Sequence, residues 1–104
     1  MRLARIHILI VAATAFGGSQ AMAADADHGG ELAKRWCAAC HLVESSQKQA
    51  SADVASFAAI AQKSDFTPEK VAFFLLDPHP KMPELPLSRA AAEDIAAYVE
   101  SLRQ

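Results

Sequence analysis

The segment from Cys37 to His41, Cys-Ala-Ala-Cys-His, constrains this chain more than any other feature of its sequence. Two cysteines separated by two residues and followed at once by histidine are the attachment signature of c-type haem. The two thiols add to the two vinyl groups on one edge of a porphyrin, and the next residue presents its imidazole to the iron from one face. This spacing predicts that Cys37 and Cys40 are covalent anchors and that His41 is the proximal axial ligand.

Cysteine pairs at this spacing also occur in zinc sites and in redox-active dithiols. A tetrahedral zinc site needs two further ligands, and the chain has no third cysteine; His28 and His79 are candidates that lie far apart in the sequence. A redox dithiol is typical of a βαβ setting, whereas the sequence around this pair is rich in alanine and leucine and favours helix. Both alternatives stay open beside haem attachment, which the sequence favours.

Residues 1–23 have the three parts of a secretory signal peptide. Two arginines form a basic start, residues 6–16 form an apolar stretch, and a small-x-small cleavage site follows. We predict cleavage near Ala23 and Ala24, which leaves residues 24–104 as a single domain. The apolar stretch is shorter than the ~20 residues that span a bilayer, so no stable membrane insertion is expected, although an uncleaved anchor stays open.

Removal of this leader changes the charge of the chain. The full sequence has 10 basic and 12 acidic residues, and the leader contains Arg2 and Arg5 but no acid, so the mature chain has 8 basic residues against 12 acidic ones. This net charge of −4 excludes a basic nucleic-acid-binding surface. A domain of about 80 residues rarely gains more than a few kcal/mol from its apolar core alone, and a buried porphyrin would enlarge that core.

Hydrophobic spacing and capping residues predict four helices, at residues 27–36, 52–62, 68–76 and 89–102. Either Asp25 or Asp27 caps the first helix, and Thr67 followed by Pro68 begins the third. The sequence predicts an interior position in the second helix for Val54, Phe57, Ala58 and Ile60.

The last two predicted helices differ in how their apolar residues are arranged. The third helix has so many large apolar side chains that both of its faces are expected to be buried. The fourth has one apolar face, which should pack on the first helix, whereas Arg89, Glu93, Asp94 and Glu100 should form its solvated face.

Met82 is the second residue that the sequence marks as a candidate iron ligand. It lies in a loop that four prolines within nine residues stiffen, between two predicted helices and downstream of the cysteine motif. A rigid backbone there would present the thioether to the open face of the iron, and a His/Met pair raises the reduction potential. His79, three residues away, would give a bis-histidine iron instead, and a five-coordinate iron stays open as well.

These features together resemble a small class I bacterial cytochrome c. The resemblance rests on Gly29-x-x-Leu32 before the cysteines, the cysteine–histidine motif, the Lys81-Met82-Pro83 loop and the closing segment 94–99, in the order of that family. It covers nearly all of the mature chain. It implies an all-α fold of about four short helices around one covalently attached haem c, with Gly29 meeting the Ile95/Tyr98 face where the first and last helices cross.

The chain departs from the family pattern behind the haem histidine. Many members have a proline soon after this residue, whose carbonyl accepts a hydrogen bond from the imidazole, but no proline occurs between His41 and Pro68. Another backbone carbonyl must take this role. The sequence does not identify which one.

The resemblance implies single-electron transfer in the periplasm, after secretion across the inner membrane, by a protein that is not an enzyme. Its expected partners are redox proteins, a donor dehydrogenase and an acceptor oxidase or cytochrome, which a monomer contacts briefly. One alternative is a dedicated electron-accepting subunit of a periplasmic dehydrogenase. Another is a haem peroxidase or gas-binding protein with an open distal site, for which His79 is the only candidate acid–base residue.

Overall fold

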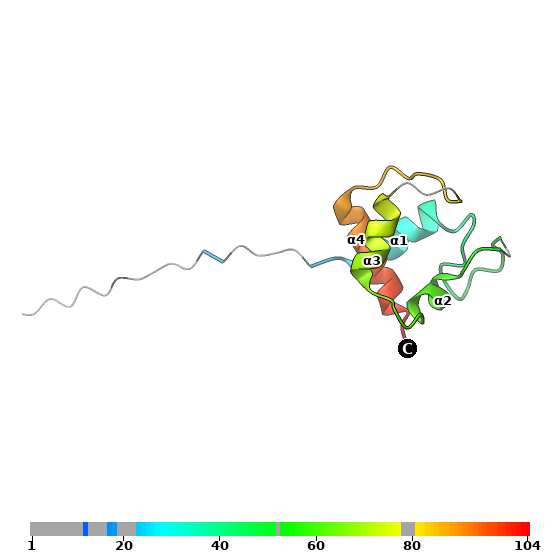
Figure 1. The fold of residues 1–104 in the computed structure, drawn as a ribbon, viewed down its shortest axis with the longest axis horizontal. Helices are drawn as coiled ribbons and strands as arrows, with labels where there is room; N and C mark the ends of the chain where they lie inside the picture. The colour runs from blue at the N-terminus through cyan, green and yellow to red at the C-terminus, as the bar shows by residue number, and fades with distance from the viewer. Residues whose placement is uncertain (1–11, 13–16, 19–22, 52, 78–80) are drawn as a thin grey trace, which may run out of the picture.

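The computed structural model describes residues 12, 17–18, 23–51, 53–77 and 81–104. Four α-helices follow one another in these ranges: α1 (Ala26–Trp36), α2 (Phe57–Ala61), α3 (Pro68–Leu76) and α4 (Arg89–Ser101) (Figure 1). The predicted all-α class is thereby confirmed. In the described part of the chain, no helix has the length and apolar character needed to cross a membrane. The leader predicted over residues 1–23 lies almost entirely outside the described residues.

A side-chain cap fixes the start of every helix. In each case an oxygen of the capping residue accepts a hydrogen bond from the backbone N–H three residues further on, which satisfies one of the free donors of the first turn. The four caps are Asp25, Ser56, Thr67 and Ser88. Asp25, rather than Asp27, therefore caps α1, and α3 begins at Pro68 as predicted.

The second helix is shorter than the sequence predicts. It begins at Phe57 rather than at residue 52, because the Phe57 N–H donates to the carbonyl of Leu42 (2.9 Å) and ties the preceding segment to the loop after the cysteine motif. Ser56 then supplies the cap. Phe57 is buried as predicted and Ile60 is half-buried, whereas Ala58 is exposed, contrary to the prediction.

Helix α4 is the element that the other three helices contact. Its closest neighbour is α1, which crosses it at Gly29: a Cβ atom built on this glycine would overlap the backbone carbonyl group of Asp94. The neighbouring Gly30 lies against the ring of Tyr98. The sequence predicted that Gly29 meets the Ile95/Tyr98 face. In the structure Gly29 meets the backbone of Asp94 and Ile95, and Gly30, rather than Gly29, meets Tyr98.

Asp94 joins the start of α1 to α4. Its carboxylate accepts a hydrogen bond from the Asp25 N–H (2.7 Å), and its second oxygen lies 2.7 Å from Nδ1 of His28. The prediction that Asp94 belongs to the solvated face of the last helix is therefore wrong, and its side chain is only 16% exposed. The close approach at Gly29 brings this carboxylate beside the first turn of α1.

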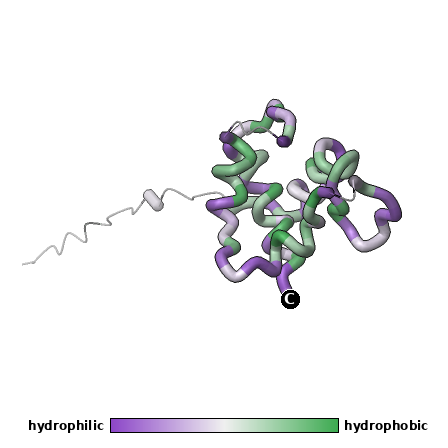
Figure 2. The backbone as a smooth tube through the Cα atoms, turned by 45° about the vertical axis from the view of Figure 1, so that its right-hand side comes forward, coloured by the Kyte–Doolittle hydropathy of each residue, from purple (hydrophilic) through white to green (hydrophobic). Residues whose placement is uncertain are grey.

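The buried core is built mainly from small side chains. Its largest fully buried members are Val43, Ile95 and Val99, and alanines from α1, α3 and α4 fill much of the rest. Figure 2 shows hydrophobic stretches along the packed helices and hydrophilic stretches in the connecting loops. A core of such small side chains gains little free energy from apolar burial.

The prediction that both faces of α3 are buried is wrong. Ala72 is its one buried residue, whereas Phe73 is 70% exposed and Phe74 is 53% exposed. The reason is that α4 is the only helix that α3 contacts in the described ranges. The remaining sides of α3 line two separate cavities.

Gly29→Ala should lower the free energy of unfolding by about 2 to 3 kcal/mol, because the added methyl group forces the backbones of α1 and α4 apart. This loss exceeds the ~1 kcal/mol by which alanine favours helix over glycine. Gly30→Ala is the matched control. Its Cβ would meet the Tyr98 ring at 3.1 Å, and this side chain can shift by a few tenths of an ångström. Chemical denaturation should place Gly30→Ala within about 1 kcal/mol of the unaltered protein; equal losses for both variants would contradict the close backbone contact.

The Asp94 contact should make stability depend on pH in the acid range. Burial raises the pKa of the Asp94 carboxyl group, but hydrogen bonds from His28 and Asp25 and the charge of His28 outweigh it and hold the pKa below its ordinary value of 3.8. The ionised carboxylate therefore stabilises the fold above about pH 4, and this contribution is lost as the pH falls through the folded pKa. Asp94→Asn should lower the unfolding free energy by about 1 kcal/mol at pH 7, and this difference should shrink as the pH falls below about 4. Glu93→Gln should change neither the unfolding free energy nor its pH dependence.

Candidate haem-binding site

Helix α1 leads directly into the cysteine motif. Cys37 caps the end of the helix and donates its N–H to the carbonyl of Ala33 (2.8 Å), and the His41 N–H then donates to the carbonyl of Cys37 (2.9 Å). The motif is thereby coiled into tight turns. Cys37 is buried, Cys40 is exposed and His41 is half-buried.

The imidazole of His41 is fixed by its Nδ1 atom, which lies 2.6 Å from the carbonyl oxygen of Ala55. A carbonyl oxygen can only accept, so Nδ1 carries the proton and donates it. In the neutral ring, the other nitrogen, Nε2, then has the free lone pair that an iron ligand needs. Ala55 supplies the carbonyl that the sequence could not identify, and the Phe57 ring lies 5.4 Å from the imidazole, centroid to centroid.

A cavity of about 320 Å³ brings three of the four predicted site residues together: Cys37, His41 and Met82 all line it. Most of its wall is apolar. It comes from α2, α3, α4 and the segment between α2 and α3, and includes Phe57, Ile60, Phe66, Val71, Phe74, Leu75, Ile95 and Val99. Cys40, the fourth predicted residue, is exposed and does not line the cavity. His79, the competing ligand, lies outside the described residues.

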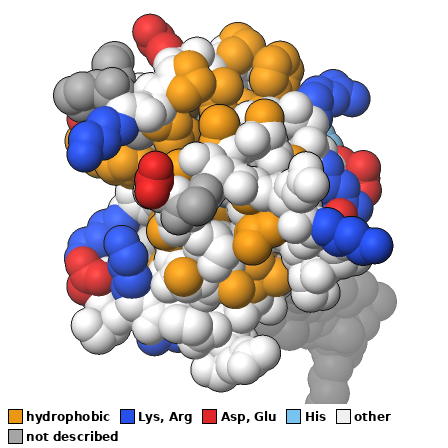
Figure 3. All heavy atoms as spheres, turned by 90° about the vertical axis from the view of Figure 1, so that its right-hand side faces the viewer, with side chains coloured by type: hydrophobic (Ala, Val, Ile, Leu, Met, Phe, Trp, Pro, Cys, Tyr) orange, Lys and Arg blue, Asp and Glu red, His pale blue; other side chains and the backbone are white. Residues whose placement is uncertain are grey.

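The cavity also has a polar edge. Lys63, Asp65, Thr67 and Lys70 line it, and the Lys70 ammonium group donates to the backbone carbonyl of Asp65 (3.1 Å). Figure 3 shows apolar side chains gathered on the face at the right-hand side of Figure 1, with lysine and arginine side chains at its edges. An apolar wall with cations at one edge suits a flat apolar group that carries carboxylates at one edge.

The other interpretations of the cysteine pair gain no support from this geometry. In the described part of the chain, no group of three or more His, Cys, Asp or Glu side chains is placed to hold a metal ion, as a zinc site would require. Burial raises the pKa of the Cys37 thiol to about 11, whereas redox-active dithiols depend on a lowered thiol pKa. The two cysteines form no disulfide with each other.

Comparison with known proteins decides between these interpretations. Residues 24–99 match the family described as "Cytochrome C oxidase, cbb3-type, subunit III". The chain is also 64% identical over 96 residues to "Cytochrome c-552" of Bradyrhizobium diazoefficiens, an alignment that covers 92% of each protein. This chain belongs to the cytochrome c family. No solved structure matches it.

Membership of this family implies a covalently bound haem c, and the residues of this cytochrome fit that group. The cysteines have the spacing of the attachment motif, the imidazole has a free Nε2 lone pair, and a thioether lines the same apolar cavity. These are the donor types that c-type haem uses: two thiols, an imidazole and a second axial ligand.

Gln47 organises the loop behind the motif, and the sequence analysis did not single it out. Its side-chain nitrogen lies within hydrogen-bond distance of the carbonyls of Ala38 (2.9 Å), His41 (2.8 Å) and Gln49 (2.9 Å), which share its two N–H groups. Its side-chain oxygen accepts from the Val43 N–H (3.0 Å). One side chain thus holds two carbonyls of the cysteine–histidine motif. Only a glutamine in a polar stretch marks this position in the sequence, and that is too weak a signal to find it.

Gln47→Ala should lower the free energy of unfolding of this cytochrome by about 2 to 4 kcal/mol, because several half-buried groups lose their hydrogen-bond partner together. Gln49→Ala, an exposed glutamine two residues along, is the matched control and should change stability by less than about 0.5 kcal/mol. Hydrogen exchange gives a local measure: the Val43 amide proton should exchange faster in Gln47→Ala alone. Unchanged exchange at Val43 would contradict the role of the Gln47 side chain.

Proposed function

We propose that this cytochrome is a periplasmic single-electron carrier whose haem is attached through Cys37 and Cys40 and whose iron is ligated by His41 and Met82. The observation that carries the proposal is the shared cavity: an imidazole with a free Nε2 lone pair and a thioether line the same apolar space, together with Cys37. Imidazole and thioether are the axial pair of high-potential electron-transfer haems.

The proximal side is held by two separate contacts. The Ala55 carbonyl fixes the orientation and the tautomer of the His41 ring, and the Gln47 amide holds the backbone carbonyl of the same histidine. A hydrogen bond from Nδ1 to a carbonyl also makes the imidazole a stronger electron donor. The ligand therefore stays in place when the charge on the iron changes.

The distal side depends on the stiffness of the loop around Met82. Pro83 and Pro86 follow the methionine, and two further prolines precede it in the sequence. Each proline fixes its own φ angle and restricts the residue before it, so the loop has few conformations available. Holding the Met82 thioether in one position therefore costs little conformational entropy.

Two filled axial positions favour electron transfer over catalysis. When bound, the haem supplies an iron that changes reversibly by one electron between the ferric and ferrous states. With His41 and Met82 both occupied as ligands, no position remains for peroxide, oxygen or another substrate. The apolar side chains that line the cavity support this proposal, because they would limit the access of water to the iron.

The leader that the sequence predicts supports a periplasmic setting for this activity. We propose that residues 1–23 are a signal peptide cleaved near Ala23 and Ala24, which delivers the domain of residues 24–104 to the periplasm. There the protein is a monomer that exchanges electrons with redox proteins, a donor dehydrogenase and an acceptor oxidase or cytochrome. Brief contacts of small area are typical of such encounters.

Met82→Ala should abolish the weak near-infrared absorption band that reports methionine sulfur on ferric haem iron. The same variant should bind carbon monoxide readily when reduced, because it leaves one axial position open, and its reduction potential should fall. The optical spectrum of the purified oxidised and reduced protein measures these effects directly. The unaltered protein should show the band and bind carbon monoxide only slowly.

His79→Ala is the matched control, because it changes the competing ligand three residues away in the same loop. It should keep both the near-infrared band and the potential. Loss of the band in His79→Ala, or its absence from the unaltered protein, would overturn ligation by Met82 and favour a bis-histidine or five-coordinate iron.

A further inference from the structure

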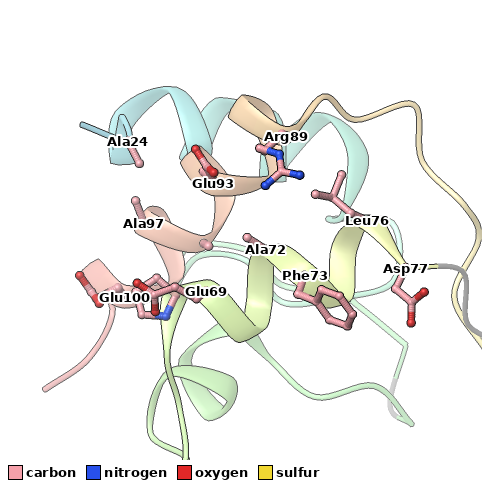
Figure 4. Close-up of a pocket in the computed structure, with 12 residues that line it drawn as sticks. Ala24, Glu69, Ala72, Phe73, Leu76, Asp77, Arg89, Glu93, Ala97 and Glu100 are labelled. Carbon is pink, nitrogen blue, oxygen red and sulfur yellow. The ribbon is translucent and has the colours of Figure 1, made fainter. Parts of the chain in front are cut away.

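A second and larger cavity, of about 770 Å³, contains none of the predicted haem ligands. It is a groove between α3 and α4, with Ala24 at one end, and we call it the α3/α4 groove (Figure 4). Its floor consists of small side chains, among them Ala72 and Ala96, which are buried where the two helices touch. Small residues on the floor leave room for an incoming side chain.

Large apolar side chains stand at the α3 side of this groove. Phe73 is 70% exposed and Leu76 is 41% exposed, and both line the groove. Figure 4 shows them on α3, across from residues of α4 such as Glu93 and Ala97. In soluble proteins, exposed apolar side chains that gather beside a groove with a polar rim mark an interaction site.

The rim of the α3/α4 groove is acidic. Four carboxylates line it, Glu69, Asp77, Glu93 and Glu100, against a single cation, Arg89. All four acids are exposed, and none forms an ion pair with another residue in the described part of the chain. The groove therefore combines an apolar floor with a side-chain net charge of −3 at its edge, which becomes −2 when cleavage leaves the α-amino group at Ala24.

We propose that the α3/α4 groove docks a partner protein that presents an apolar side chain flanked by lysine or arginine. The apolar side chain fits over the alanine floor beside Phe73, and the cations meet the carboxylates of the rim. Complementary charge of this kind sets the specificity and speeds the association of two proteins. A second copy of this chain is the poorer occupant, because two acidic rims would face each other.

This docking surface is separate from the haem cavity but lies only one helix away from it. Helix α3 turns Phe73 and Leu76 to the groove, whereas Val71, Phe74 and Leu75 line the haem cavity. A partner held in the groove would leave the cavity edge around Lys63 and Lys70 accessible. The same molecule could then remain attached to one protein while it exchanges electrons with another. This inference goes beyond the proposed function and does not depend on which residue is the distal ligand.

The test uses the reduced holoprotein, labelled with ¹⁵N, and a synthetic amphipathic peptide of leucine and lysine as the probe. Titration should shift the amide signals of groove residues such as Ala72, Phe73 and Ala97, and the binding should weaken as salt is added. A peptide of the same length with glutamate in place of lysine should produce no shifts. The visible spectrum, recorded in parallel, should stay unchanged. Because this spectrum reports the haem ligands and the amide signals report peptide binding, an error in the ligand assignment would be distinguished from a failure of docking.

Glu93→Lys should raise the dissociation constant of the leucine–lysine peptide by about tenfold, because it replaces an attraction at the rim by a repulsion. Glu31→Lys is the matched control: it makes the same change in net charge on the exposed surface of α1 and should raise the constant by no more than about twofold. Phe73→Ser should also weaken binding, which tests the apolar part of the site. Circular dichroism checks that each variant is folded.

Three results would overturn the proposal. Amide shifts centred on the haem cavity, or spread evenly over the surface, would mean that the groove is not the docking site. Equal effects of Glu93→Lys and Glu31→Lys would mean that the peptide responds only to net charge. Association of the protein with itself in sedimentation experiments, lost in Phe73→Ser, would assign the groove to a second copy of the chain instead.

Discussion

The close approach of α1 and α4 at Gly29 is the contact on which the rest of the structure depends. Without a side chain at this position, the backbone of α1 reaches the carbonyl group of Asp94, and the cysteine motif at the end of α1 is held in a fixed place. Three further contacts between the start and the end of the domain follow from it. Tyr98 donates to the Val43 carbonyl (2.6 Å), and the Asp94 carboxylate binds both Asp25 and His28.

This crossing provides rigidity but little apolar burial. The fully buried side chains are mainly alanines with a few β-branched residues, which is a small core even for a domain of this size. Larger apolar side chains of α2 and α3, such as Phe57, Phe74 and Leu75, line the haem cavity. The helices are thus packed firmly at one side and leave an apolar space at the other. A covalently attached haem would fill that space and complete the core. The cofactor would therefore stabilise the fold as well as carry the electron.

The sequence predicted those features whose causes are local. Caps and prolines a few residues away determine where α1, α3 and α4 begin, and the attachment motif is contiguous. The sequence did not predict the features that depend on contacts between residues far apart in the chain. The Ala55 carbonyl reaches His41 across 14 residues, the Asp94 carboxylate reaches His28 across 66, and the tie between Phe57 and Leu42 delays the start of α2. The role of Gln47 could not be predicted for a related reason. Its hydrogen bonds join residues close in sequence, but they form only when the loop folds back on the cysteine–histidine motif.

The distribution of charge is a second property that the sequence alone cannot give. A net charge of −4 for residues 24–104 favours a partner with a basic surface but does not show where that partner binds. In the structure, Lys63 and Lys70 lie at the edge of the haem cavity, whereas four carboxylates surround the α3/α4 groove. Because electrostatic steering follows the local field at short range, the excess of acid would act at the groove. The lysines at the cavity edge would instead face the carboxylates of the haem. One face of α3 would then bind the protein that holds this cytochrome, and the opposite face would line the haem cavity.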